Sequence, residues 1–234
     1  MIRIISFLLL ATLLPLAAQS APRSGEESVK PGINTRYLDP ELQVDEWLKR
    51  FEVESREVFH KREEILKACG IKPGMKVADI GAGTGLYTRL FSNAVGEQGW
   101  VYAVDINGRF LEHIQARAAQ EKQNNITTVL CPQDSISLPP ASIDFAFLCD
   151  VYHHFEFPKT SLASLHQALK PGGRIILIDF IRIDGVSNEW TLNHVRAGED
   201  VFRQEFEDAG FRFEARLDLP GLKENYCLHF VKPE

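Results

Sequence analysis

The 234-residue chain lacks an excess of basic residues: 26 lysines and arginines stand against 32 aspartates and glutamates, and the formal net charge is −6. Duplex nucleic-acid binders usually present a basic face, so this balance argues against such a partner. The chain also lacks low-complexity tracts and repeats of about 20–50 residues, so nothing indicates a repeat architecture. With 44% hydrophobic residues, the length suits one α/β domain with a sizeable core.

Cysteines are few, and their spacing matches neither a CxxC motif nor a zinc ribbon. Three of the four close or lie within predicted strands, where a buried thiol behaves as a small hydrophobe. We expect free thiols, although one disulfide stays open as an alternative in an exported protein. The four are Cys69, Cys131, Cys149 and Cys227.

No apolar run reaches the about 20 residues of an ordinary membrane span. The longest, residues 4–18, follows Arg3, and small residues at 18 and 20 suit cleavage before residue 21. We therefore predict a signal peptide over residues 1–20 and an exported protein, periplasmic or secreted. The mature chain would have no stable membrane span, and an uncleaved signal would instead anchor the protein in the membrane.

The next two segments differ in composition. Residues 21–36 have few apolar side chains and several turn formers, which predicts a flexible linker. Residues 37–69 are predicted to be helical, with Asp39 as N-cap, Pro40 at the first helical position and Gly70 as the stop.

Strand and helix patterns alternate over residues 70–234. This predicts an α/β fold: a three-layer, doubly wound sandwich whose seven-stranded sheet is mostly parallel. Only a short turn joins the last two strands, so a C-terminal hairpin with one antiparallel strand is expected. Strands are predicted at 76–80, 100–106, 126–131, 144–149, 174–180, 211–219 and 226–232, and helices at 86–95, 110–120, 158–169 and 198–209.

A glycine-rich turn follows the first predicted strand. Gly81, Gly83 and Gly85 let the backbone approach a ligand closely. A dinucleotide fingerprint, G-x-G-x-x-G, counted from Gly81 would have its last glycine at position 86, which is Leu86 here. The last glycine of this turn, Gly85, comes one residue earlier. Asp79, two residues before the first glycine, would repel a phosphate but suits a cofactor that carries an ammonium group.

Two further acidic residues end neighbouring strands. Asp105 closes the second strand, where a carboxylate can accept hydrogen bonds from both ribose hydroxyls. Asp134, just after the third strand, can accept from an adenine amino group, although loop and cap roles are also ordinary for aspartate.

Together with the segments 144–155 and 169–174, these motifs resemble the class I S-adenosylmethionine-dependent methyltransferases over about residues 70–234. The second segment (Leu-Lys-Pro-Gly-Gly-Arg) looks like that family's Pro-Gly-Gly turn. The resemblance implies S-adenosylmethionine as cofactor. It implies that the 79–85 turn holds the methionine part, with Gly81, Gly83 and Gly85 in the turn, Asp105 on the ribose, Asp134 on the adenine, Ile106 packed on the adenine face, and Cys149 and Asp150 beneath the sulfonium.

Residues beyond the fourth strand should face the acceptor. The candidate catalytic residues there are Tyr152, His153 and His154. A histidine would deprotonate or orient the acceptor, although a capping or packing role is equally open. We expect no metal site, because two adjacent histidines alone have poor chelating geometry; one that adds Cys149, Asp150 or His194 is the alternative.

The connection 183–198 is long and rich in aromatic, amide and basic groups, which is typical of a binding wall. Its candidate acceptor-binding residues are Trp190, His194 and Arg196.

The sequence thus favours an enzyme that transfers a methyl group from S-adenosylmethionine to a small-molecule acceptor of unknown identity. A non-catalytic S-adenosylmethionine-binding protein of the same fold is the first alternative. A nicotinamide-dependent oxidoreductase is disfavoured by Leu86. The sequence carries no signal for oligomeric state.

Overall fold

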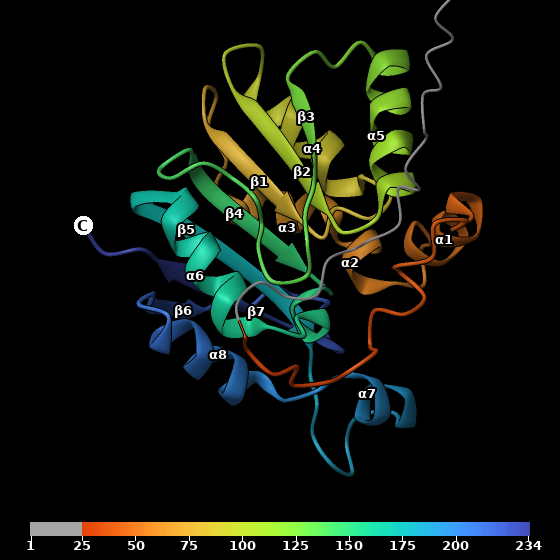
Figure 1. Cartoon of the computed structure of the whole chain (residues 1–234), viewed down its shortest axis with the longest axis vertical. Coiled ribbons are helices and arrows are strands. Elements are labelled where there is room, and N and C mark those ends of the chain that lie inside the picture. Colours follow the sequence, from red (N-terminus) through yellow and green to blue (C-terminus); the bar gives the residue numbers. More distant parts are fainter. Residues whose placement is uncertain (1–24) are drawn as a thin grey trace, which may run out of the picture.

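The computed structural model describes residues 25–234, and over this range a seven-stranded sheet lies between two layers of helices (Figure 1). The signal peptide predicted over residues 1–20 lies outside the described residues. In chain order the elements are α1 (Val44–Phe51), α2 (Glu57–His60), α3 (Arg62–Cys69), β1 (Lys76–Ile80), α4 (Leu86–Val95), β2 (Trp100–Asp105), α5 (Gly108–Glu121), β3 (Ile126–Leu130), β4 (Ile143–Cys149), η1 (Tyr152–His154, a 3₁₀ turn), α6 (Pro158–Ala168), β5 (Leu169–Phe180), α7 (Glu189–His194), α8 (Glu199–Asp208), β6 (Arg212–Arg216) and β7 (Asn225–Val231).

The strand order is β3-β2-β1-β4-β5-β7-β6. The strands from β3 to β5 are parallel, and β7 runs antiparallel to both β5 and β6. The predicted α/β fold with a C-terminal antiparallel hairpin strand is therefore confirmed. Strand order reverses between β1 and β4, which is where such sheets bind ligands, beyond the carboxyl ends of the strands.

Alternating side chains of the strands supply two separate cores. In β4, Phe145 and Phe147 pack toward α3 and α4, while Ala146 and Leu148 pack toward α6 and α8. Since side chains alternate across a strand, a continuous apolar run such as that of β4 can fill both faces at once. The central strands of the sheet are therefore buried on both sides.

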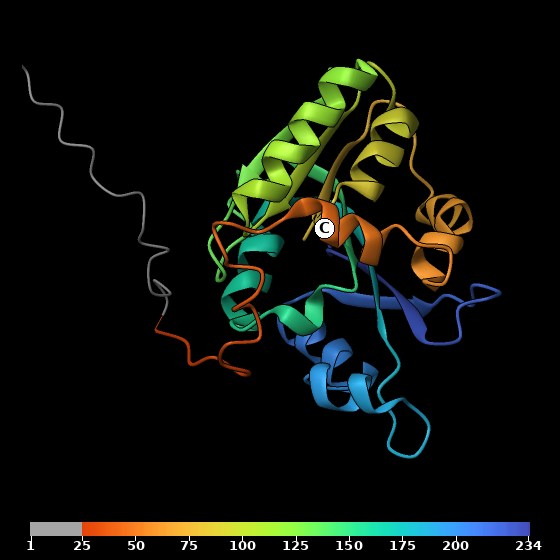
Figure 2. The ribbon, with the colours of Figure 1, turned by 90° about the vertical axis from the view of Figure 1, so that its right-hand side faces the viewer.

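Residues 25–43 do not run free of the domain. The Glu26 carboxylate accepts hydrogen bonds from the backbone N–H groups of Lys159 and Thr160, at the start of α6. The Val29 N–H donates to the Glu156 carbonyl over 2.9 Å. Figure 2 shows this segment passing alongside α6 before the chain reaches α1. Residues 25–36, expected to belong to a linker, thus lie against the domain because several of their polar groups pair with it.

The first helix starts later than predicted. Asp39 caps a turn by accepting from the Glu41 N–H over 2.9 Å, and α1 begins only at Val44. The turn that contains Pro40 does not continue into the helix, so the predicted start of the helix at residue 40 is wrong.

The strand β5 is longer than its prediction, because Leu169 already pairs with Ile143 ahead of the Pro-Gly-Gly turn. All four cysteines are free thiols. Among residues 25–234, no helix has the length and apolar character needed to cross a membrane.

Candidate active site

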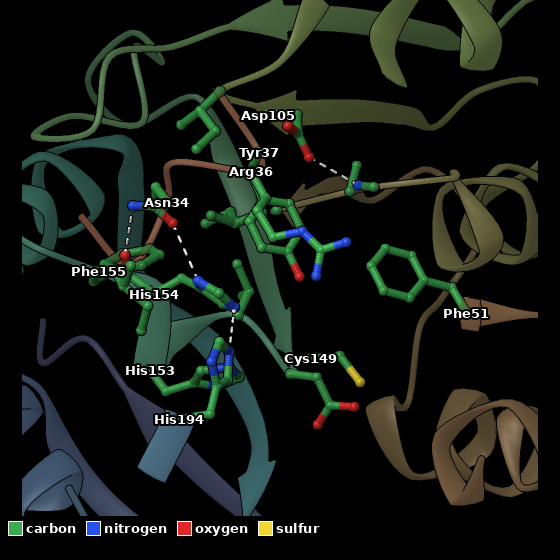
Figure 3. A pocket seen from close by; sticks show the side chains of 18 of the residues that line it. Asn34, Arg36, Tyr37, Phe51, Asp105, Cys149, His153, His154, Phe155 and His194 are labelled. Carbon is green, nitrogen blue, oxygen red and sulfur yellow. Dashed lines mark hydrogen bonds between the residues drawn. The ribbon is translucent and has the colours of Figure 1, made fainter. Parts of the chain in front are cut away.

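A cavity of about 820 Å³ lies at the carboxyl ends of the parallel strands. Small-molecule sites commonly fall between about 300 and 1,000 Å³, so the cavity has room for more than one ligand of modest size. The ends of β1, β2 and β4 form its floor, and residues 30–37 and α7 form part of its walls. Figure 3 shows side chains from these distant segments directed into the same space.

The glycine turn after β1 lines one end of this cavity. Gly81 has φ +69°, and a Cβ there would lie 2.2 Å from the Val151 Cγ2. Gly83, with φ +52°, lies next to the Phe51 ring. Only glycine satisfies both the dihedral and the space at Gly81, so the turn leaves bare backbone facing the cavity. Gly85 does not line the cavity; it precedes α4 and contacts Ile114.

Two buried carboxylates flank the turn. Asp79 accepts a hydrogen bond from the Thr88 hydroxyl over 2.6 Å, and burial raises the pKa of Asp79 to about 7. Asp105 accepts from the backbone N–H groups of Gly83 and Asn107 at 2.9 and 2.8 Å, and burial raises its pKa to about 6. Each carboxylate oxygen has two lone pairs, so both side chains keep capacity to accept hydrogen bonds from a ligand.

The two residues expected at the adenine are placed differently. Ile106 lines the cavity beyond β2. Asp134 is buried but does not line the cavity, whereas its neighbours Gln133 and Ser135 do. The Gln133 amide oxygen accepts from the Asn34 side chain over 2.7 Å. The Gln133 amide and Ser135 therefore supply polar groups at this wall, and the adenine role of Asp134 stays a prediction.

Cys149 and Asp150 follow β4 and both line the cavity, as expected. Burial raises the pKa of the Cys149 thiol well above its usual value, so the thiol is protonated and is a poor nucleophile. Asp150 has φ +52° and forms an ion pair with Arg56. It also accepts from the Asn225 amide over 2.6 Å, so this carboxylate already holds two partners at the cavity floor.

The predicted histidines His153, His154 and His194 meet at the other end of the cavity (Figure 3). His154 Nε2 lies 3.3 Å from His194 Nε2. Burial, together with the neighbouring His153 and His194, lowers the pKa of His154 to about 2. Burial also lowers the pKa of His194 to about 4. Both imidazoles are therefore neutral at pH 7.

Tyr152 does not reach the cavity. It is fully buried, its hydroxyl donates to Glu205 over 2.7 Å, and its ring packs against Phe202 and Phe206 at centroid distances of 4.9 Å. The predicted catalytic role of Tyr152 is wrong, because the 3₁₀ turn after β4 points this side chain into the core.

Arg196 is also structural. Its guanidinium forms two hydrogen bonds to Glu205, at 2.8 and 2.6 Å, and lies over the ring of Phe202. It is absent from the cavity lining, so the predicted pairing with an acceptor is wrong. By contrast, Trp190 lines the cavity and stacks on His194 with ring centroids 4.6 Å apart.

Several site residues were absent from the prediction. Asn34 and Tyr37 come from the segment that precedes the helices, and both contact His154. Asp179 at the end of β5 accepts from the ring nitrogen Nδ1 of His153 over 2.8 Å. Asp179 carries the same signal that singled out Asp105, a carboxylate that closes an apolar parallel strand, and that signal would have found it.

Comparison with known proteins fits this geometry. Residues 78–177 match the sequence profile of a family described as a methyltransferase domain. This region is therefore similar to a methyltransferase domain. A structure of a SAM-dependent methyltransferase from Aquifex aeolicus is similar, with a TM-score of 0.72 and 26% identity, covering 81% of this chain and 98% of that one. An S-adenosylmethionine-dependent methyltransferase from Mesorhizobium loti, at 17% identity and a TM-score of 0.60, shares the fold over 75% of this chain and 98% of that one.

Curated relatives point to the same domain type. The ubiquinone/menaquinone biosynthesis C-methyltransferase UbiE of Shewanella putrefaciens is 31% identical over 123 residues, which are 52% of this chain and 49% of that protein. The protein of the same name from Shewanella pealeana is 27% identical over 176 residues, 62% of this chain and 70% of that protein. The chain spans about half the length of the first of these relatives. S-adenosylmethionine is the cofactor of this domain type.

Proposed function

We propose that the protein transfers a methyl group from S-adenosylmethionine to a small-molecule acceptor. The observation that carries this proposal is the shape and lining of the 820 Å³ cavity around the β1 turn. Buried carboxylates and bare glycine backbone lie at one end of it, and neutral imidazoles with an indole lie at the other. One end thus suits a nucleoside with an ammonium group, and the other suits an uncharged or weakly polar acceptor.

The cofactor end fits S-adenosylmethionine on the chain's own geometry. A Cβ at Gly81 would fill the space beside Val151, so the turn is built for close approach. Asp79 would receive the ammonium group and Asp105 the ribose hydroxyls, while Ile106 and the Gln133 amide would border the adenine. The cofactor supplies a methyl group on a sulfonium that is already activated. The protein's share is then alignment and exclusion of water.

The acceptor would lie under the N-terminal segment. Burial raises the pKa of Tyr37 to about 12, so its ring contributes a neutral wall beside His154. Phe180 and Trp190 pack edge to face at a centroid distance of 5.3 Å and continue this wall. Together with the acidic net charge, an enclosed aromatic wall supports a small-molecule acceptor over a nucleic acid.

The experiment that tests turnover uses S-adenosylmethionine with an isotopically labelled methyl group, incubated with the protein and a small-molecule extract of cells. We expect a labelled product that depends on the protein and is missing with the Asp105→Asn variant. Binding of S-adenosylmethionine without any labelled product would instead support the non-catalytic binding protein. Binding of a reduced nicotinamide dinucleotide in its place would support the oxidoreductase.

We also propose export, periplasmic or secreted, on the strength of Arg3 and the apolar run 4–18. Fractionation of cells followed by sequencing of the mature N-terminus tests this. We expect a first residue at 21 outside the cytoplasm, and an intact residue 1 in the cytoplasmic fraction would refute it.

A further inference from the structure

Three imidazoles converge at the acceptor end of the cavity. His153 and His154 come from the turn after β4, and His194 is the last residue of α7. One ring nitrogen from each lies within 4.8 Å of the others. In Figure 3 the three rings point toward one another rather than toward the labelled Asp105.

The neighbours of His154 fix which of its nitrogens carries the proton. The Asn34 amide NH₂ donates to the Gln133 side chain and to the His154 carbonyl, at 2.7 and 2.9 Å. The Asn34 oxygen therefore faces His154 Nδ1, 3.1 Å away, and Nδ1 must donate to it. This leaves the lone pair of His154 on Nε2, the atom that faces His194.

His153 is held in the same tautomer by a carboxylate. Asp179 accepts from His153 Nδ1 over 2.8 Å and from the His153 backbone N–H over 3.1 Å. Asp179 is fully buried, so it supplies a negative charge directly behind the ring. Metal-ligating histidines nearly always donate their second N–H to a carboxylate or carbonyl in this way.

His194 is held by packing and by its backbone. Trp190 stacks on its ring, and the Lys30 ammonium donates to the Asn193 and His194 carbonyls at 2.8 and 2.6 Å. Lys30 belongs to the segment that also supplies Asn34. The N-terminal segment thus contacts two of the three histidines, His154 through Asn34 and His194 through Lys30.

The spacing of the nitrogens suits a tetrahedral ion. Zinc–nitrogen bonds of about 2.0–2.1 Å place two ligand nitrogens about 3.3–3.4 Å apart. The His154 and His194 Nε2 atoms already lie 3.3 Å apart. The third nitrogen lies within 4.8 Å of both, so it needs to approach them by at most about 1.4 Å to reach the same spacing.

We propose that His153, His154 and His194 bind one divalent transition-metal ion of the zinc type, with Asp179 and Asn34 as the positioning residues behind two of the rings. Three histidines with a further open position are the ligand set of catalytic rather than structural zinc. All three histidines line the cavity, so the open position of a bound ion would be reached from it.

What the open position of the ion would bind rests on the proposed function. It lies at the end of the cavity away from Asp79 and Asp105, where the acceptor would bind. An ion there selects acceptors that present an oxygen or sulfur donor, such as a hydroxyl or a thiol. It also polarises that atom without help from a basic side chain.

The test uses untagged, chelator-treated protein titrated with Zn²⁺ by calorimetry. We expect one ion per chain for the wild type. Asp179→Asn should weaken zinc binding by ~10–100-fold, because it removes the residue that positions His153. His194→Ala should weaken zinc binding further, because it removes a metal ligand itself. The matched control is His60→Ala, which removes an exposed histidine that pairs only with Glu54 and should bind as the wild type does.

A second measurement does not depend on any variant. Co²⁺ added to the wild type should give the strong visible absorption of a tetrahedral site. The proposal would be overturned if the wild type bound Zn²⁺ no more tightly than His194→Ala does, or if the Co²⁺ spectrum were octahedral. Either result would leave the three imidazoles as a hydrogen-bonded cluster. S-adenosylmethionine binding, measured on the same wild-type sample, reports on the proposed function separately, so either conclusion can fail while the other stands.

Discussion

The Asp105 carboxylate at the end of β2 accepts a hydrogen bond from the backbone N–H of Gly83 over 2.9 Å, and so joins two neighbouring strand ends. Its other oxygen accepts from the Asn107 N–H at the start of α5. Under the proposed function the same carboxylate also receives the ribose hydroxyls. The residue therefore serves the shape of the turn and the binding of the cofactor together.

Asp105→Asn should weaken S-adenosylmethionine binding by about 10–100-fold. An amide NH₂ cannot accept, and a hydrogen bond to a charged group is worth about 1.5–3 kcal/mol. Calorimetric titration measures the change. Asp184→Asn makes the same charge change on an exposed loop and should bind like the wild type; equal affinities for the two variants would contradict the role of Asp105.

The affinity for S-adenosylmethionine should rise with pH up to about 7. Burial raises the pKa of Asp79 from 3.8 to about 7, so below that pH a proton must leave before the carboxylate can pair with the ammonium group. We expect about a tenfold loss of affinity per pH unit below about 7. Asp79→Asn should bind weakly and without this slope, and a wild-type affinity independent of pH would count against the pairing.

The same pKa shift predicts the stability of the cofactor-free protein. A carboxyl whose pKa is raised by folding favours the native state fully below about 3.8, and this contribution is lost as pH rises through about 7. The free energy of unfolding of the wild type, relative to Asp79→Asn, should therefore fall over this window. Urea titrations at several pH values measure this difference in the free energy of unfolding. A difference that rises with pH would contradict the raised pKa of Asp79.

Gly81→Ala should destabilise the protein more than Gly185→Ala. Both glycines have positive φ, +69° and +76°, so both variants bear the left-handed strain of about 1–2 kcal/mol. Only at Gly81 does the new methyl group meet Val151, and overpacking adds about 1–3 kcal/mol. Urea unfolding of the two variants isolates this second contribution. Equal losses in the free energy of unfolding would show that the turn accommodates a methyl group at residue 81 without a clash.

Arg196→Ala should lower stability by about 1.5–3 kcal/mol, because it removes the two hydrogen bonds of the guanidinium to the Glu205 carboxylate. Arg212→Ala, which removes an exposed pair with Glu214, should cost less than about 1 kcal/mol. Thermal unfolding compares them. An Arg196 variant as stable as the Arg212 variant would contradict the structural role of Arg196.

The sheet and the cofactor end were predictable because their signals are local. A strand, a glycine turn and a helix are contiguous in sequence, and Asp79 and Asp105 stand where their strands end. The parallel strands then bring these ends together without further information.

The acceptor end depended on contacts between distant segments. Composition marked residues 21–36 as a linker, yet Asn34 reaches the cavity because its amide pairs with Gln133 and the His154 carbonyl. Neither of those partners is near it in sequence. The direction of Tyr152 and the pairing of Arg196 with Glu205 likewise depend on how η1 and α8 pack, which no periodicity encodes.

The central claim is that the β1 turn binds S-adenosylmethionine, and calorimetric titration of the wild type at pH 8 tests it most directly. At that pH the Asp79 carboxylate is ionised. The account predicts one site per chain, binding of both S-adenosylmethionine and its demethylated product, and marked loss of both with Asp105→Asn. Absence of binding heat and of any thermal stabilisation by either nucleoside would contradict it.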